Sequence, residues 1–391
     1  MIFNNKENKE IKDLKMYIKN KNMIENRYIN SQLMPEFNFI AKEMKNFKFK
    51  GIIVYPEAIM WEPIQRPQQL LKEFAKKGYL CFFCEPNPKD DYIIKEVEKN
   101  LYLVNGQEKL LPLIKDKEII FYISYFLQYI YSIFINNKII WLDVLDRLDF
   151  FDRYNKFSKK IWKKLIKNAD IITYTATNLK SYIKDRNDAI LISNAANVDD
   201  FIVRDKYIPN DIKPVLKLNK IIIGYFGAIE NWFDISLIEK INNYDKYSVV
   251  LIGNVNQEFI DKKNMTNVYF LGAKDYKELK NYTKYFDIGI IPFIVNDLTN
   301  NVSPVKFFEY IAAGLPVIST PIYEMKKYNT PILKLIDIKD YDNINNIIDE
   351  MLIMDKKSIK LECQKISFIN TWTMRANFIE EKIKEVKLNG K

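Results

Sequence analysis

From Gly51 onward the chain alternates short apolar runs with amphipathic segments, and this pattern occurs twice. Such alternation is typical of β-α-β units that build a parallel sheet. Most of the runs are apolar at consecutive positions, as strands buried on both faces of a sheet must be. We expect strands at residues 51–55, 80–83, 101–104, 118–123, 138–144, 170–174 and 189–193, and again at 220–227, 247–253, 267–272, 286–293 and 315–320. The sequence therefore predicts an α/β fold with two parallel-sheet domains.

The segment 206–219 separates the two halves, because it is rich in prolines and turn residues. A length of 391 residues suits two domains of roughly 100–200 residues each. We expect a basic helical extension at 1–48, Rossmann-like domains at 49–205 and 206–370, and a helix at 371–391 that crosses back toward the first domain. Two such domains in tandem predict a ligand site in a cleft at the carboxyl ends of their strands.

The chain contains no histidine, and this absence narrows the chemistry. It excludes Ser-His-Asp and Cys-His nucleophile systems and zinc held by imidazoles. Any acid–base step must then use carboxylates, lysine, tyrosine or the substrate itself. Cys81 and Cys84 form a C-x-x-C in an apolar run, but an odd separation on a strand points two thiols to opposite faces. We expect no metal site and a reducing compartment.

The net charge of +10 is concentrated near the start of the chain, where residues 1–50 hold 11 basic and 6 acidic residues. Ile11, Leu14 and Ile18 recur at helical spacing beside lysines. Such a helix can lie on anionic lipid, or it can be solvated and pack on the protein body. No nucleic-acid motif is present, and no apolar run is long enough to span a membrane. We expect a cytoplasmic protein, peripheral at the inner face of the membrane if this helix binds lipid.

The segment NNVSPVKFFEYIAAGLPVIST (300–320) is the densest candidate site. Ser303 as N-cap, followed by Pro304 and Val305, would place unpaired amides and the positive end of a helix dipole toward an anion. Lys306 would add a full charge, and Glu309 can accept hydrogen bonds from a pair of ribose hydroxyls. The spacing alone is equally compatible with an ordinary capped helix that carries a solvated Lys-Glu pair.

This segment resembles the donor-binding helix of family-4 GT-B glycosyltransferases, which has the form (S/P)-x-K-x-x-E-Y-x-A-x-G-x-P-V-(I/V). In that family the glutamate holds the ribose, and the preceding loop and helix start hold the diphosphate; Glu309, Ser303 and Lys306 match. Asn301 stands where the family has a first glutamate, usually placed near the donor sugar. Branches that act on bacterial envelope polysaccharides, including the teichuronic-acid type, show similar relaxed versions.

The resemblance continues in the first half of the chain. WEPIQRPQQL (61–70) is similar to the W…QRPxxL element of that branch, which makes Arg66 a candidate contact for a phosphate or the acceptor. WLDVLD (141–146) matches a D-x-x-D element at the end of a strand, so Asp143 and Asp146 are the acceptor-side candidates. A plain surface loop is the alternative for that pair. Asn194 keeps a polar position of the family's N-G-V-D-like turn and is a second candidate contact for the acceptor or a phosphate.

Gly227 follows the first strand of the second half, where the lack of a Cβ would let the backbone approach a diphosphate. Many relatives carry an arginine or lysine shortly after this glycine. This chain has none there, unless Lys240 serves.

The resemblance implies a retaining, metal-independent glycosyltransferase without a cofactor. It would move a sugar from a nucleotide-diphosphate sugar to a saccharide or lipid-linked acceptor, with the departing phosphate accepting the proton. Two alternatives stay open: a catalytically silent scaffold or nucleotide-binding subunit that keeps the fold, and a nucleotide-sugar 2-epimerase on the same fold.

Overall fold

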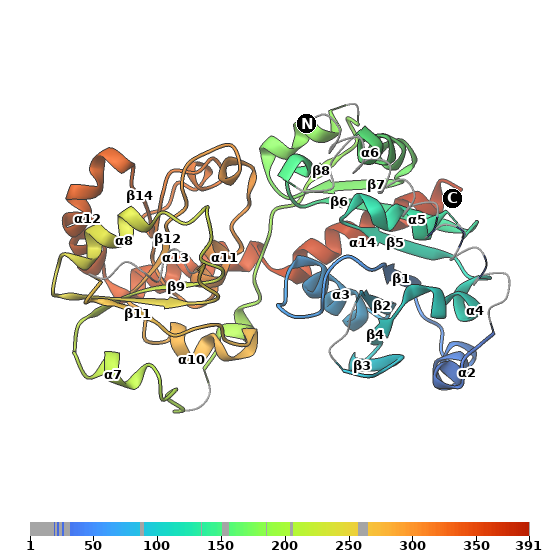
Figure 1. Cartoon of the computed structure of the whole chain (residues 1–391), viewed down its shortest axis with the longest axis horizontal. Helices are drawn as coiled ribbons and strands as arrows, with labels where there is room; N and C mark the ends of the chain where they lie inside the picture. Colours follow the sequence, from blue (N-terminus) through green and yellow to red (C-terminus); the bar gives the residue numbers. More distant parts are fainter. Residues whose placement is uncertain are drawn as a thin grey trace, which may run out of the picture. The chain divides into compact units, whose positions relative to one another are not determined.

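The computed structural model describes residues 19, 22, 26, 32–86, 90–133, 135–150, 156–184, 186–203, 206–256 and 265–390. They form two compact units, each built on one sheet with helices packed against it (Figure 1). The first unit comprises Met1–Ile192 and Arg375–Lys391, and the second comprises Ser193–Met374. The prediction of two Rossmann-like parallel-sheet domains is confirmed.

The sheet of the first unit has eight strands among the described residues, in the order β3-β4-β2-β1-β5-β6-β7-β8. All neighbours pair in parallel except β3, which pairs antiparallel with β4 at the edge. The sequence did not predict β3, because its charged residues IKEVE lack the apolar run of a buried strand. The strands are β1 (Ile52–Tyr55), β2 (Leu80–Glu85), β3 (Ile94–Glu98), β4 (Leu101–Asn105), β5 (Ile119–Ile123), β6 (Lys138–Val144), β7 (Ile171–Tyr174) and β8 (Ile190–Leu191).

The helices of the first unit bury apolar faces against this sheet, with Phe37, Leu165 and Leu179 among the residues of a common core. They are η1 (Pro35–Phe37), α2 (Asn38–Asn46), α3 (Arg66–Lys76), η2 (Gln107–Lys109), α4 (Leu111–Ile114), η3 (Phe126–Gln128), α5 (Tyr129–Ser132), η4 (Leu148–Phe150), α6 (Lys156–Asn168) and η5 (Thr177–Ile183).

The sheet of the second unit has six described strands, all parallel, in the order β11-β10-β9-β12-β13-β14. The short edge strand β14 was not predicted from the sequence. The strands are β9 (Ile221–Phe226), β10 (Tyr247–Ile252), β11 (Val268–Phe270), β12 (Ile288–Ile291), β13 (Val317–Ser319) and β14 (Leu333–Leu335).

The helices of the second unit share a second core, which includes Leu237, Phe307 and Ile348. They are η6 (Val198–Phe201), α7 (Lys213–Leu216), α8 (Ile235–Asn242), η7 (Tyr276–Glu278), α10 (Lys280–Thr283), η8 (Thr299–Asn301), α11 (Val305–Ala312), η9 (Met325–Lys327), η10 (Ile338–Asn343), α12 (Ile344–Leu352) and α13 (Lys356–Ile369).

The boundary between the units lies after Ile192, earlier in the chain than residues 205 and 206 where the sequence placed it. The reason is packing: Ala196 and Phe201 are buried in the core of the second unit. Turn-rich composition marked the segment 206–219, but composition does not show on which core the preceding loop packs.

The C-terminal helix α14 (Trp372–Leu388) begins in the second unit, and its residues from Arg375 onward belong to the first. Glu380 on this helix accepts from Lys77 at 3.0 Å and from Lys50 at 3.4 Å. Lys77 terminates α3, so these ion pairs attach α14 to the first unit.

The predicted basic helix around Ile11–Ile18 lies outside the described residues. Within the part of the chain that the structure describes, no helix combines the length and the apolar character that crossing a bilayer requires.

Candidate functional site

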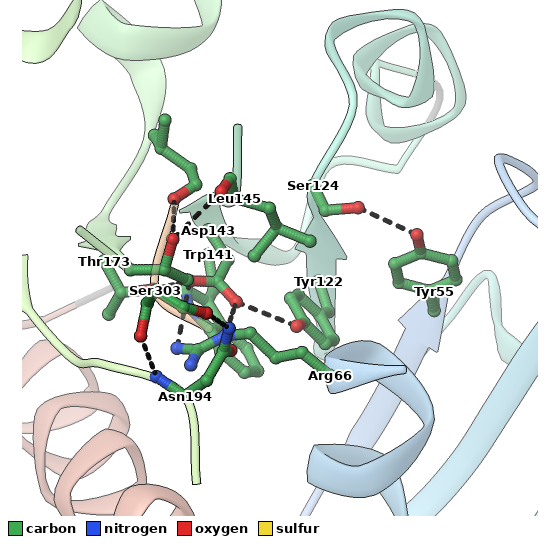
Figure 2. Close-up of polar contacts among 12 residues, drawn as sticks. Tyr55, Arg66, Tyr122, Ser124, Trp141, Asp143, Leu145, Thr173, Asn194 and Ser303 are labelled. Atoms are coloured by element: carbon green, nitrogen blue, oxygen red, sulfur yellow. Dashed lines mark hydrogen bonds and ion pairs between the residues drawn. The ribbon is translucent and has the colours of Figure 1, made fainter. Parts of the chain in front are cut away.

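The start of α11 differs in detail from the prediction. Pro304, not Ser303, is the N-cap, and the helix begins at Val305. Ser303 is held from another segment: its Oγ accepts the Asn194 backbone N–H at 3.2 Å, and the Asn194 side-chain amide donates to the Ser303 carbonyl at 2.7 Å (Figure 2). Asn194 was predicted to contact an acceptor or phosphate. In the structure, Asn194 is instead hydrogen-bonded to Ser303, the residue before the N-cap of α11.

The first amides of α11 are available to a ligand. The N–H groups of Val305 and Lys306 make no hydrogen bond to any described residue, whereas Phe307 donates to the Pro304 carbonyl at 3.2 Å. Unpaired amides and the helix dipole together favour an anion at this position.

Lys306 projects from this helix start to Gly227, at the end of β9. Its ammonium lies 5.3 Å from the centre of the Tyr225 ring and 5.7 Å from that of Phe293. Among the described residues it has no carboxylate within ion-pair distance, and burial lowers the pKa of its ammonium. A cation beside two aromatic rings that forms no ion pair with any described residue is an attractive site for an anionic ligand.

Gly227 and Gly253 are both required by the local geometry. Gly227 has a φ of 131°, and a Cβ on it would lie 2.3 Å from Lys306 Cε and 2.4 Å from Nζ. A Cβ on Gly253 would lie only 1.9 Å from the Gly227 carbonyl oxygen. These two glycines let the ends of β9 and β10 meet beside the Lys306 ammonium.

We expect Gly227→Ala to displace Lys306 and weaken binding of a nucleoside diphosphate by about tenfold, roughly the loss of one charge-assisted contact. The matched control is Gly272→Ala, because Gly272 also has a positive φ, of 69°, but nothing lies within 4 Å of its would-be Cβ. Calorimetric titration with UDP and GDP measures both variants. Equal affinity in the two variants would contradict a binding role for the Gly227 position.

Glu309 lies on the same helix and is 6% exposed. Burial raises the pKa of its carboxyl to about 7; Lys306 and a hydrogen bond with Tyr276 oppose this shift, and Asp200 adds to it. Tyr276 also donates to Asp200 at 3.4 Å. The sequence did not single out Tyr276 or Asp200, because they approach Glu309 only through the fold.

The chain departs from the family pattern in two ways: it lacks a cation shortly after Gly227, and it has Asn301 in place of the first glutamate. Lys240 does not replace the missing cation near Gly227, because it lies on α8 and pairs with Asp342 at 2.5 Å. Lys306 lies beside that glycine instead. Asn301, at the position of the family's first glutamate, donates its side-chain amide to the Asp297 carbonyl at 2.6 Å.

In the first unit, Arg66 and Asp143 form a buried ion pair (Figure 2). Arg66 is 3% exposed and Asp143 is fully buried inside β6. The guanidinium donates from Nε at 2.7 Å and from Nη2 at 3.3 Å, and Tyr122 and Thr173 donate to the same carboxylate at 2.8 and 2.6 Å. With both oxygens engaged by protein groups, Asp143 is a structural partner of Arg66. This corrects its assignment as an acceptor-side residue.

Asp146 lies three residues beyond Asp143, in the bend after β6, and its side chain is exposed. The D-x-x-D element therefore places one carboxylate in the interior and one at the surface, because the strand ends at Val144.

The C-x-x-C pair is inert in this fold. Cys81 and Cys84 are free and buried within β2, and burial raises the pKa of both thiols. Protonated, buried thiols are poor nucleophiles and poor metal ligands.

The second unit matches a known family: residues 210–365 fit the model described as "Glycosyl transferases group 1". This part of the chain is therefore similar to the group 1 glycosyltransferases. The matched residues include Gly227, Lys306 and Glu309. The match ends before α14 and does not extend into the first unit.

A relative of the chain is named as the teichuronic acid biosynthesis glycosyltransferase TuaH of Bacillus subtilis (strain 168). The two are 27% identical over 192 residues, which are 45% of this chain and 48% of the relative's length. The alignment thus spans about half of that protein.

Solved structures of other proteins also superpose on this chain. Sucrose-phosphate synthase from Thermosynechococcus elongatus superposes with a TM-score of 0.67 at 14% identity, covering 87% of this chain and all of that one (100%). HepE of Anabaena, solved with UDP and glucose, gives 0.60 at 13% identity and covers 85% and 99%. These similarities show the fold.

Proposed function

We propose that the chain is a glycosyltransferase that uses a nucleotide-diphosphate sugar as donor, with retention of configuration and without a metal ion. The observation that carries this proposal is the arrangement in the second unit. There, Lys306 lies against Gly227 with no ion-pair partner among the described residues, one helical turn from the buried Glu309. The Lys306 ammonium suits the phosphates of the donor, and the Glu309 carboxylate suits the hydroxyls of its ribose.

The leaving group defines the chemistry at this site. When the bond from the anomeric carbon to the β-phosphate oxygen breaks, negative charge develops on the diphosphate. The Lys306 ammonium and the amides of Val305 and Lys306 stabilise that charge in a largely buried setting. The acceptor oxygen bonds to the anomeric carbon on the same face, and its proton passes to the departing phosphate, since the chain has no histidine to serve as base.

For the acceptor side, Asp146 is the remaining carboxylate of the two predicted, because Asp143 is occupied by Arg66. We propose that Asp146 orients the acceptor hydroxyl. The name of the relative TuaH supports a saccharide or lipid-linked acceptor in bacterial envelope polysaccharide synthesis.

A panel of UDP, GDP, TDP and CDP and their sugars tests the proposal. We expect one nucleoside diphosphate to raise the melting temperature of the full chain, by roughly 2–4 °C for each 1 kcal/mol of binding free energy. We also expect the matching donor sugar to be slowly hydrolysed or transferred. Binding without any turnover would favour the nucleotide-binding subunit instead, and no binding across the panel would contradict both.

A further inference from the structure

Helix α6 of the first unit, Lys156–Asn168, has an unusual charge pattern. Its 13 residues, KFSKKIWKKLIKN, contain six lysines and no acidic residue. A charge of +6 on this one helix compares with +10 for the whole chain. The other face is buried, with Ser158, Ile161, Trp162 and Leu165 at helical spacing. The helix is therefore fixed on the first unit with its lysines on the outer face.

All six lysines are exposed. Lys160, Lys163, Lys164 and Lys167 make no ion pair or side-chain hydrogen bond with any residue that the structure describes. Elsewhere, exposed lysines often have a partner, such as Lys240 with Asp342 and Lys246 with Asp349. The four lysines of α6 thus form an uncompensated row, which we call the α6 lysine row.

The row opposes the stability of its own helix. Lys160 and Lys164, and likewise Lys163 and Lys167, are four positions apart, and like charges at that spacing repel. A counter-anion surface would relieve this repulsion. The row extends over much of a helix about 18 Å long, so that surface must offer several negative charges over a comparable distance.

We propose that the α6 lysine row binds an anionic lipid bilayer. Clusters of four to eight basic residues on an amphipathic helix suit the surface of an anionic membrane, where each contributes on its own. The basic residues of the helix are all lysine, a point charge, and none is arginine, whose planar fork reads single phosphates and nucleic acids. The one tryptophan of the helix, Trp162, is buried and donates to the Tyr182 carbonyl at 3.1 Å, so it cannot stack on a base.

A cavity beside the α6 lysine row offers a binding position for a lipid head group. Lys163 and Lys167 line a cavity of about 740 Å³, together with Arg186, Asp170 and, from the end of α14, Val386 and Asn389. Arg186 is already used, because it donates to the carbonyls of Ile166 and Ala169 at the end of α6 and pairs with Asp188. Asp170 accepts the Ile140 backbone N–H, and the two lysines outweigh its single negative charge, so the lining is net positive.

The test is co-sedimentation of the full chain with vesicles of phosphatidylglycerol and phosphatidylcholine against vesicles of phosphatidylcholine alone. We expect binding to the anionic vesicles only, falling steeply as salt rises from about 50 to 300 mM. The quadruple variant K160Q/K163Q/K164Q/K167Q should reduce the partition coefficient at least about tenfold, since each lysine near such a surface contributes up to about fivefold.

Two further variants separate charge from structure. K160R/K163R/K164R/K167R keeps the charge and should bind like the natural chain. K326Q/K356Q/K357Q/K360Q removes four exposed lysines of the second unit that pair with no described side chain, and should also bind normally. Donor binding, measured without vesicles, should be unchanged in all three variants. A failure of the membrane proposal would therefore leave the proposed glycosyltransferase function uncontradicted.

Three results would overturn the proposal. The first is no preference of the natural chain for anionic vesicles. The second is undiminished binding by the glutamine variant, which would leave another surface, such as the basic N-terminal residues, as the anchor. The third is tighter binding of the row to a duplex or single-stranded oligonucleotide than to the vesicles at the same salt.

Discussion

Glu309→Ala is expected to weaken binding of the cognate nucleoside diphosphate about 100-fold and to reduce kcat/KM by at least as much. The carboxylate is buried on α11, one turn beyond Lys306, and offers two oxygens to a pair of ribose hydroxyls. A hydrogen bond to a charged group contributes about 1.5–3 kcal/mol. Two bonds at the lower value total about 3 kcal/mol, which corresponds to about 100-fold in affinity. Calorimetric titration and donor turnover measure the two losses. Full activity in this variant would refute the donor site.

The pH profile provides an internal control for Glu309. Burial raises the pKa of its carboxyl to about 7, above the ordinary value of 4.5. If the ionised form binds ribose, donor affinity should fall as pH drops from 8 through 7 to 6. Glu309→Gln should lack this step, although titration of the ligand phosphates remains in both proteins.

The raised pKa of Glu309 affects folding stability in the opposite direction to donor binding: stability falls as the pH rises. A raised pKa in the folded state contributes stability that is present below 4.5 and is lost as pH rises through about 7. Neutral substitutions at Glu309 should therefore leave the free protein at least as stable at pH 8. A loss of binding would then reflect the site and not unfolding.

Asp143→Leu is expected to lower the free energy of unfolding of the first unit by about 3–5 kcal/mol. The substitution leaves the Arg66 guanidinium, which is 3% exposed, without its carboxylate. Tyr122 and Thr173 lose the oxygens to which they donate. Urea unfolding followed by fluorescence measures the loss, because Trp141 lies on β6 two residues before Asp143 and stacks on Tyr122 at 3.9 Å.

Two variants show whether this loss comes from the stranded charge. The double substitution Arg66→Met with Asp143→Leu removes both charges and should recover much of the stability, as apolar replacements of buried ion pairs often do. Tyr122→Phe removes one hydrogen bond and should cost only about 1 kcal/mol. A stable Asp143→Leu protein with abolished turnover would instead restore Asp143 as an acceptor-side residue.

Much of the fold could be predicted from the sequence, because buried parallel strands are apolar at every position. The runs at β1, β5 and β9 can be recognised in this way. The edge strands β3 and β14 were missed. β3 is charged and half exposed, and β14 has only three residues, so neither carries the apolar run that marks a central strand.

Within the candidate site, the linear pattern located Glu309 and Lys306, because both lie on one helix of recognisable form. It did not show that Lys306, rather than Lys240, would lie beside Gly227. The lysine row of α6 was readable as KFSKKIWKKLIKN, a run of 13 residues without an acid, but only the buried face of the helix shows that the row is fixed on one surface.

The sequence by itself determined the α/β class, the two repeats of the strand-helix pattern and the helix that holds the donor candidates, since hydrophobic periodicity is a local property of the chain. Only the tertiary structure decided that Asp143 is an interior partner of Arg66 while Asp146, three residues on, is exposed. The two residues of the ion pair are 77 positions apart, and they meet only because the fold brings Arg66, at the start of α3, to Asp143 in β6. Contacts of that separation exist only after the sheet has formed.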